Sequence, residues 1–183
     1  MKMLLDFDFN NFKTDLIMAT ENVFLEIINK YQDIYAFSLS FSSNLMNIGV
    51  FANTLKGLDK KMKEDPENIW YYKFCEEEWE INEDQSPNFQ KIKQNLINYL
   101  QSHEITDENY IYTDLFIAFR NKIFKTCVEA LLTLKRRGIF LDNIIINFYV
   151  REYFNGEEAI DIFKTLNEKD NISDFIEYID EFI

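Results

Sequence analysis

The sequence predicts an α+β fold: a small, largely antiparallel sheet with helices packed against it. Segments with helical spacing of apolar residues are interrupted by short segments that alternate like strands. Their order is helix, two strands, helix, strand, two helices, strand and two helices, which lacks the regular alternation of a doubly wound fold. Hydrophobic residues make up 47% of the 183 residues, and there are only 2 prolines and 4 glycines. These totals favour one compact domain over residues 1–183.

The first three elements are predicted from their periodicity. Residues 12–31 repeat apolar side chains every three or four positions, which is typical of an amphipathic helix. Residues 35–41 then alternate strictly, and this pattern places Tyr35, Phe37, Leu39 and Phe41 on one face of a strand. A polar turn at residues 42–44 and an apolar segment at residues 46–52 complete a hairpin, for which we expect one buried face.

The middle of the chain is less regular. Thr54 can cap a short helix that ends before Asp65-Pro66. Residues 69–81 are aromatic and then acidic, and their first half suits a strand or a strand-to-loop transition. Pro87 fits the first turn of another helix, whose apolar stripe runs to Leu100.

The C-terminal half contains the longest predicted helix, about residues 110–137. Residues 106–108 are candidates to cap it, and Gly138 is placed to end it. Residues 144–150 form the best strand of the sequence, and because both of its faces are apolar we expect a central strand. Two acidic helices follow, near residues 157–166 and 173–182.

The charge of the chain limits its partners. The sequence has 19 basic and 32 acidic residues, a formal net charge of −13. Such a surface repels nucleic-acid phosphates and anionic lipids, so we expect neither nucleic acid nor membrane as a partner. The longest apolar runs cover about a quarter of a membrane span, and no secretory signal is seen. These features predict a cytoplasmic protein.

Common catalytic and cofactor motifs are missing from the sequence. It contains no GxGxxG, GxxxxGK[ST], GxSxG or HExxH pattern. Cys75 and Cys127 have neither disulfide-framework nor zinc-site spacing, and His103, the one histidine, fits a solvated loop. The three glutamates beside Cys75 disfavour a thiolate there. We expect no catalytic residue, metal or cofactor.

An acidic and aromatic segment is the candidate partner-binding site. Its residues are Glu76, Glu77, Glu78, Trp79, Glu80, Glu83 and Asp84, with Trp70, Tyr71 and Tyr72 just before them. Exposed aromatic side chains surrounded by one sign of charge can anchor a partner of opposite charge. Two alternatives exist. The segment can be a solvated acidic loop beside aromatic core residues, or it can provide paired carboxylates that serve catalysis or bind Mg²⁺. The segment has no EF-hand spacing.

Short stretches along nearly the whole chain match one known family. They lie at residues 26–31, 33–39, 52–54, 57–58, 70–74, 78–79, 138–140, 144–150 and 166–167. In these stretches the chain resembles the bacterial domain-of-unknown-function family 4303. It departs from the family pattern at Cys75-Glu76 and at Glu168. The resemblance implies an α+β fold and provides no catalytic residues. In size and acidity, members are similar to the immunity proteins encoded beside secreted bacterial toxins.

These observations favour a non-enzymatic binding protein. We expect a cytosolic immunity protein whose acidic surface blocks a basic toxin, such as a nuclease encoded nearby. The alternative is a stand-alone housekeeping domain or a carboxylate-dependent enzyme. A toxin gene adjacent to this one would favour the immunity protein, and a metabolic operon would favour the alternative.

Overall fold

The computed structural model describes residues 6–151 and 153–182. Within these residues, seven α-helices and a four-stranded sheet form the predicted α+β fold. The helices are α2 (Phe9–Lys30), α3 (Leu55–Glu64), α4 (Ile69–Phe74), α5 (Gln90–Gln101), α6 (Asp114–Arg136), α7 (Gly156–Leu166) and α8 (Ile172–Phe182). The strands are β1 (Ile34–Phe41), β2 (Ile48–Thr54), β3 (Ile81–Asn82) and β4 (Ile145–Val150). Short 3₁₀ turns lie at Glu76–Glu78, Pro87–Phe89 and Lys169–Asn171.

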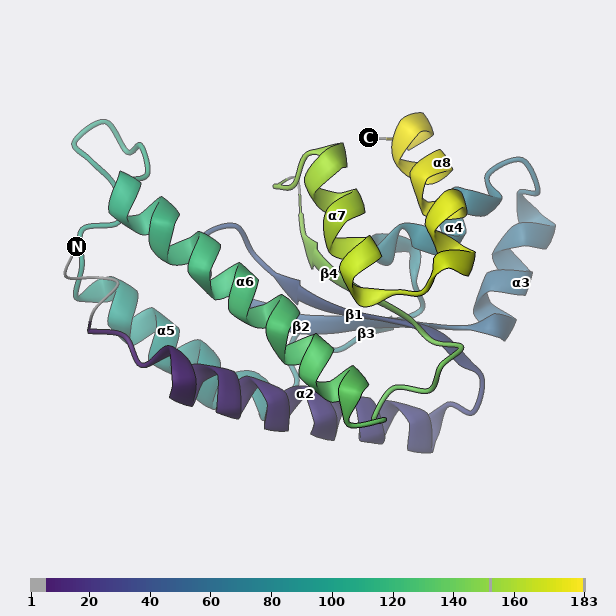
Figure 1. The fold of residues 1–183 in the computed structure, drawn as a ribbon, viewed down its shortest axis with the longest axis horizontal. Coiled ribbons are helices and arrows are strands. Elements are labelled where there is room, and N and C mark those ends of the chain that lie inside the picture. Colours follow the sequence, from purple (N-terminus) through teal and green to yellow (C-terminus); the bar gives the residue numbers. More distant parts are fainter. Residues whose placement is uncertain (1–5, 152, 183) are drawn as a thin grey trace.

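The sheet is mixed and mostly antiparallel, with the strand order β3-β2-β1-β4. The predicted hairpin is confirmed, because β1 pairs antiparallel with β2. Strand β4 pairs parallel with β1 and lies at the edge of the sheet, so the prediction of a central position for it is wrong. Both faces of β4 are apolar because helices cover both faces of the sheet, as Figure 1 shows.

The helices form two layers around the sheet (Figure 1). Helices α2, α5 and α6 cover one face, and their apolar stripes build the larger core with residues such as Phe24 and Phe119. Helices α3, α4, α7 and α8 lie on the other side, where a smaller core contains Phe74, Phe163 and Phe175. The rings of Phe163 and Phe175 stack with their centroids 3.9 Å apart, which joins α7 to α8.

The expectation of one buried face for the hairpin is also wrong. Phe37, Leu39 and Phe41 face the larger core as predicted, but Tyr35 packs in the smaller core. The pairing register between β1 and β2 shifts between Ile34 and Ala36, and this irregularity turns Tyr35 to the opposite face. The two cores therefore share β1, and both of its faces are buried.

Helix α6 is the predicted long helix, although it begins later than expected. Its N-cap is Thr113, whose hydroxyl accepts a hydrogen bond from the Phe116 N–H at 3.2 Å. Residues 106–112 instead form a loop that a bridge between Thr106 and Tyr112 closes. The prediction for Gly138 is confirmed: it adopts a φ of 70°, which favours glycine, and the helix ends just before it.

A side chain caps the free edge of β4 at one residue, Ile146. Asn167 follows α7; its Oδ1 accepts from the Ile146 N–H at 2.8 Å, and its Nδ2 donates to the Ile146 carbonyl at 2.7 Å. The same Nδ2 donates to the Phe163 carbonyl at 3.0 Å. One amide therefore satisfies both outward-facing backbone groups of a buried residue in an edge strand.

Replacement of Asn167 by alanine is expected to lower the free energy of unfolding by about 2 kcal/mol, because the Ile146 N–H and carbonyl lose their hydrogen-bond partners at a partly buried position. Urea unfolding followed by circular dichroism measures this loss. Asn143→Ala is the control, since Asn143 is exposed. Equal stability of the two variants would contradict the role given to Asn167.

Candidate functional site

The segment that leads into the acidic cluster is helical. Residues 69–74 form α4, so the expectation of a strand in this region is wrong. Trp70 and Phe74 lie four residues apart, and their rings stack with centroids 6.5 Å apart along one face of the helix. Phe74 also contacts Phe175 and Tyr178 of α8. Burial of this aromatic face against α8 stabilises the helical conformation, which six residues would not keep on their own.

Glu76 is buried and does not belong to an exposed acidic patch. It begins the 3₁₀ turn after α4, and only 4% of its surface is exposed. Its Oε1 accepts a hydrogen bond from Asn147 Nδ2 at 2.6 Å and another from the Ser38 hydroxyl at 3.3 Å. The expectation of an exposed Glu76 is therefore wrong, since the carboxyl group lies on the sheet, under the helices of the smaller core.

Two strands position the donors for this carboxyl group. Ser38 and Asn147 lie opposite each other in the parallel pair β1–β4, on the face of the sheet that carries the smaller core. Both side chains are buried. Burial of two polar side chains within apolar strands costs free energy unless they form hydrogen bonds. Glu76 provides the acceptor that Ser38 and Asn147 share.

The buried environment raises the pKa of Glu76 to about 7, from an ordinary value of 4.5. Removal from water is the main cause, because it penalises the ionised form. The hydrogen bonds from Asn147 and Ser38 act in the opposite direction, and the neighbouring Glu77 charge raises the pKa slightly further. Glu76 can therefore change its protonation state near neutral pH.

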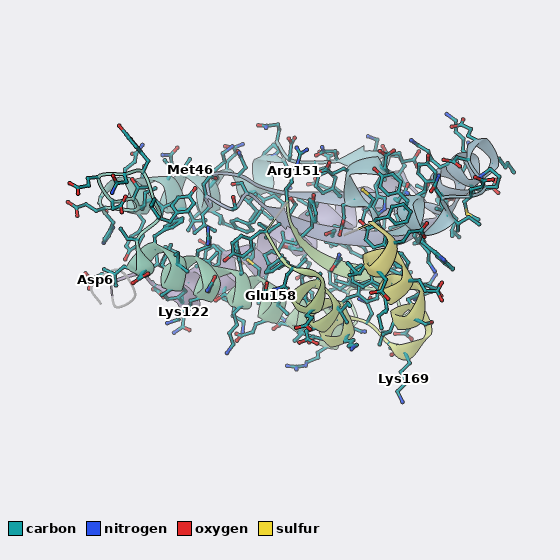
Figure 2. The ribbon with its side chains drawn as sticks, turned by 90° about the horizontal axis from the view of Figure 1, so that it is seen from above. Asp6, Met46, Lys122, Arg151, Glu158 and Lys169 are labelled. Atoms are coloured by element: carbon teal, nitrogen blue, oxygen red, sulfur yellow. The ribbon has the colours of Figure 1, made fainter. Side chains whose placement is uncertain are left out.

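A pocket of about 400 Å³ opens beside Glu76, between β4 and α8. Glu76 and Asn147 supply polar groups to its lining, and aromatic side chains supply much of the rest. The aromatic residues are Tyr71, Phe148, Tyr149, Tyr153, Phe154, Phe175, Tyr178 and Phe182. Figure 2 looks down on the α7–α8 side of the molecule and labels Arg151, which follows β4 and also lines the pocket. A largely apolar cavity with a few polar groups is the usual form of a ligand-binding site.

Glu77 and Tyr149 separate this pocket from a second one. The Tyr149 hydroxyl donates to Glu77 Oε1 at 2.8 Å, and Arg151 Nε lies 3.0 Å from the same oxygen. All three residues line both pockets, of which the second has about 450 Å³ and reaches Gly49 and Asp84. Burial and the Glu77 charge raise the pKa of Tyr149, which therefore stays protonated and acts as a donor.

Three further residues that line the pocket, Cys75, Tyr178 and Tyr71, are held in their neutral forms. Burial raises the pKa of the Cys75 thiol and of Tyr178, and the nearby Glu76 charge contributes to both. The pKa of Tyr71 rises to about 12, chiefly through the neighbouring Cys75. A thiol with a raised pKa is a poor nucleophile, which agrees with the expectation that Cys75 forms no thiolate.

Trp79 lies in the smaller core and not at the surface. Only 6% of its surface is exposed, and its ring lies edge-on to Tyr35, with centroids 6.4 Å apart. The expectation of a partly exposed tryptophan anchor is therefore wrong. The sequence pattern did not reveal this burial, because a tryptophan between glutamates reads equally well as an anchor or as a core residue.

The remaining acidic residues are partly or fully exposed. Glu78 forms an ion pair with Lys61 at 2.9 Å, and Glu80 accepts a hydrogen bond from the Thr54 hydroxyl. Among the described residues, Glu80, Glu83 and Asp84 have no ion-pair partner. The predicted cluster therefore divides into two buried residues, two paired glutamates and three acidic residues along the β3 edge of the sheet.

Other candidate residues lie away from this site. His103 is half-exposed at the end of α5, where its Nδ1 is 2.8 Å from the Tyr99 carbonyl oxygen. Cys127 is buried in α6. In residues 6–151 and 153–182, no three His, Cys, Asp or Glu side chains are grouped so as to hold a metal ion. No helix in these same ranges is long and apolar enough to span a membrane.

Comparisons with known proteins gave one match. The family model described as Domain of unknown function (DUF4303) matches residues 16–168. The matched range contains the whole sheet, Glu76 and the β4 side of the pocket, whereas α8 lies outside it. No curated protein and no solved structure matches this chain.

Proposed function

We propose that this chain, which belongs to the DUF4303 family, is a binding protein that blocks a basic partner protein with its acidic surface. A toxin-neutralising immunity protein acts in this way. The net charge of −13 supports the proposal, because opposite charge accelerates the encounter of two proteins and favours the correct orientation. The partner is then a basic toxin, such as a nuclease, whose substrate-binding surface the acidic residues occupy.

One observation carries this proposal. The acidic residues Glu80, Glu83 and Asp84 gather along β3, and none of them forms an ion pair in the described part of the chain. Exposed acidic groups on a stable surface are usually interspersed with lysine and arginine, which reduces their repulsion. Like charges left together create a field that attracts a basic surface.

A carboxylate-dependent enzyme is the second candidate, and Glu76 is the observation that favours it. A carboxyl group with a pKa of about 7 beside an open pocket has the properties of a general acid or base. Under this alternative, Glu76→Gln abolishes a turnover that the native protein shows with its substrate. Under the binding proposal, the same change leaves the association rate with the basic partner within about twofold of the native value, because Glu76 is buried.

Neutralisation of the exposed acidic residues tests the binding proposal. The variant combines Glu80→Gln, Glu83→Gln and Asp84→Asn. We expect its association with the protein encoded by the adjacent gene to slow about tenfold at low salt, because the attracting field is lost. Stopped-flow or surface-based kinetics measure the rate. Thermal stability should stay nearly unchanged, since exposed charges contribute little to folding.

The matched control removes the same amount of charge elsewhere. It combines Glu64→Gln, Glu67→Gln and Glu108→Gln, which are all exposed residues outside the 76–84 segment. Under the proposal this control slows association less than the first variant does. Equal rates for the two variants would show that only net charge matters and would contradict a binding surface at β3.

A further inference from the structure

The pocket beside Glu76 combines two features that suit one kind of ligand. Its wall presents the rings of Tyr71, Tyr149, Phe175, Tyr178 and Phe182, and Glu76 is the buried acid among its lining residues. Aromatic faces attract cations through their quadrupoles, and a carboxylate attracts them through its charge. The volume of about 400 Å³ is within the range of small-ligand sites.

Glu76 has only neutral hydrogen-bond partners in the described part of the chain. Its side-chain donors are Ser38 and Asn147, its own backbone N–H also donates, and no described lysine, arginine or histidine nitrogen lies within ion-pair distance of its carboxyl group. Among the described residues, Arg151 is the one basic residue that lines the pocket, and its Nε is paired with Glu77. The ionised form of Glu76 is therefore a buried negative charge without a compensating positive charge.

We infer that this pocket binds an organic cation, an alkylammonium or alkylguanidinium group that pairs with Glu76 against the aromatic wall. The cation supplies a positive charge that no described residue places within ion-pair distance of Glu76. Anionic ligands are disfavoured, because Glu76 and Glu77 both line the pocket. The group can come from a free amine or guanidine, or from a lysine or arginine side chain of a partner.

The pocket is distinct from the exposed acidic residues at β3. Loss of cation binding in the pocket would leave the proposed steering by Glu80, Glu83 and Asp84 untouched. Conversely, a salt-independent association with the partner protein would leave the pocket's affinity for a small cation unaffected. The failures of the two proposals are therefore distinguishable.

Cation binding is expected to depend on pH. The cation pairs with ionised Glu76, so the proton must leave before or during binding. With a pKa of about 7 for Glu76, the affinity should fall about tenfold between pH 8 and pH 6. The titratable groups facing Glu76 are Cys75, Glu77, Tyr35, Tyr149 and Tyr178. Raised pKa values keep the thiol and the tyrosines protonated over this range. Glu77 forms an ion pair with Arg151.

Nuclear magnetic resonance titration of the full chain with butylguanidinium and butylammonium chloride tests the inference. We expect saturable shifts of Glu76 and of the methyl groups of Ala159 and Ile179, which also line the pocket. The Glu76→Gln variant should bind at least tenfold more weakly, whereas Glu108→Gln should bind like the native protein. A capped Gly-Arg-Gly peptide in the same titration distinguishes the sources: tighter binding of the peptide indicates a partner's side chain, and tighter binding of the free cations indicates a small molecule.

Three results would overturn the inference. The first is the absence of saturable shifts with either cation and with the peptide at pH 8. The second is equal binding of neutral butanol, which would make the pocket merely apolar. The third is an affinity of the native protein that stays constant from pH 8 to pH 6, which would exclude Glu76 as the partner even if the Glu76→Gln variant failed to fold.

Discussion

Replacement of Trp79 by alanine is expected to lower the free energy of unfolding by about 3–5 kcal/mol. The indole is almost fully buried in the smaller core, in contact with Tyr35, so its removal leaves a cavity under the 3₁₀ turn that carries Glu76. Chemical denaturation measures the loss. The fraction that remains folded should bind the partner protein with native affinity, because Trp79 is not exposed to a partner.

Trp70 provides the control, because it is only partly buried in α4. Trp70→Ala should destabilise the protein clearly less than Trp79→Ala. A loss below about 1 kcal/mol for Trp79→Ala, together with a large loss of partner affinity, would show that the indole serves the interface and not the core.

Replacement of Glu76 by glutamine is expected to stabilise the protein above pH 7, by up to about 3 kcal/mol. The folded state raises the pKa of Glu76 to about 7, whereas the unfolded chain keeps a value near 4.5. Glu76 therefore adds no cost to folding below pH 4.5, where it is protonated in both states. As the pH rises from 4.5 to 7, the unfolded chain releases this proton while the folded protein keeps it, so stability falls; above pH 7 both states are ionised and the full cost has been reached. Glutamine cannot ionise and retains an acceptor for Ser38 and Asn147.

Denaturation of the native protein and the Glu76→Gln variant at pH 4, 6 and 8 measures this effect. The two stabilities should be similar at pH 4 and diverge as the pH rises. The Glu108→Gln variant should follow the native protein at every pH, because Glu108 is exposed. A Glu76→Gln variant that is less stable than the native protein at pH 8 would mean that the ionised carboxylate stabilises the fold.

The sequence predicted most of the fold, because periodic apolar residues decide which face of a long element is buried. Helix α6 was recognised from its apolar stripe, and Gly138 marked its end. The prediction failed for the short helix α4, where six residues hold too few turns to show a period. The spacing of Trp70 and Phe74 was the available signal for a helix.

The candidate site was predicted only in part, because burial of a charged residue depends on partners far along the chain. Glu76 lies 38 residues from Ser38 and 71 residues from Asn147, and the sheet brings the three together. A serine and an asparagine inside two strongly apolar strands were the signal for a buried polar partner. Without that signal, Glu76 is indistinguishable from Glu77 and Glu78 in a run of three glutamates.

The salt dependence of association tests the central claim most directly. The native protein and the purified product of the adjacent gene are mixed at ionic strengths from about 0.01 M to 1 M, over which the Debye length falls from about 30 Å to about 3 Å. If the acidic surface recognises a basic partner, the association rate falls steeply over this range. An association rate that stays constant from low to high salt, or an adjacent gene product that does not bind, would contradict the account.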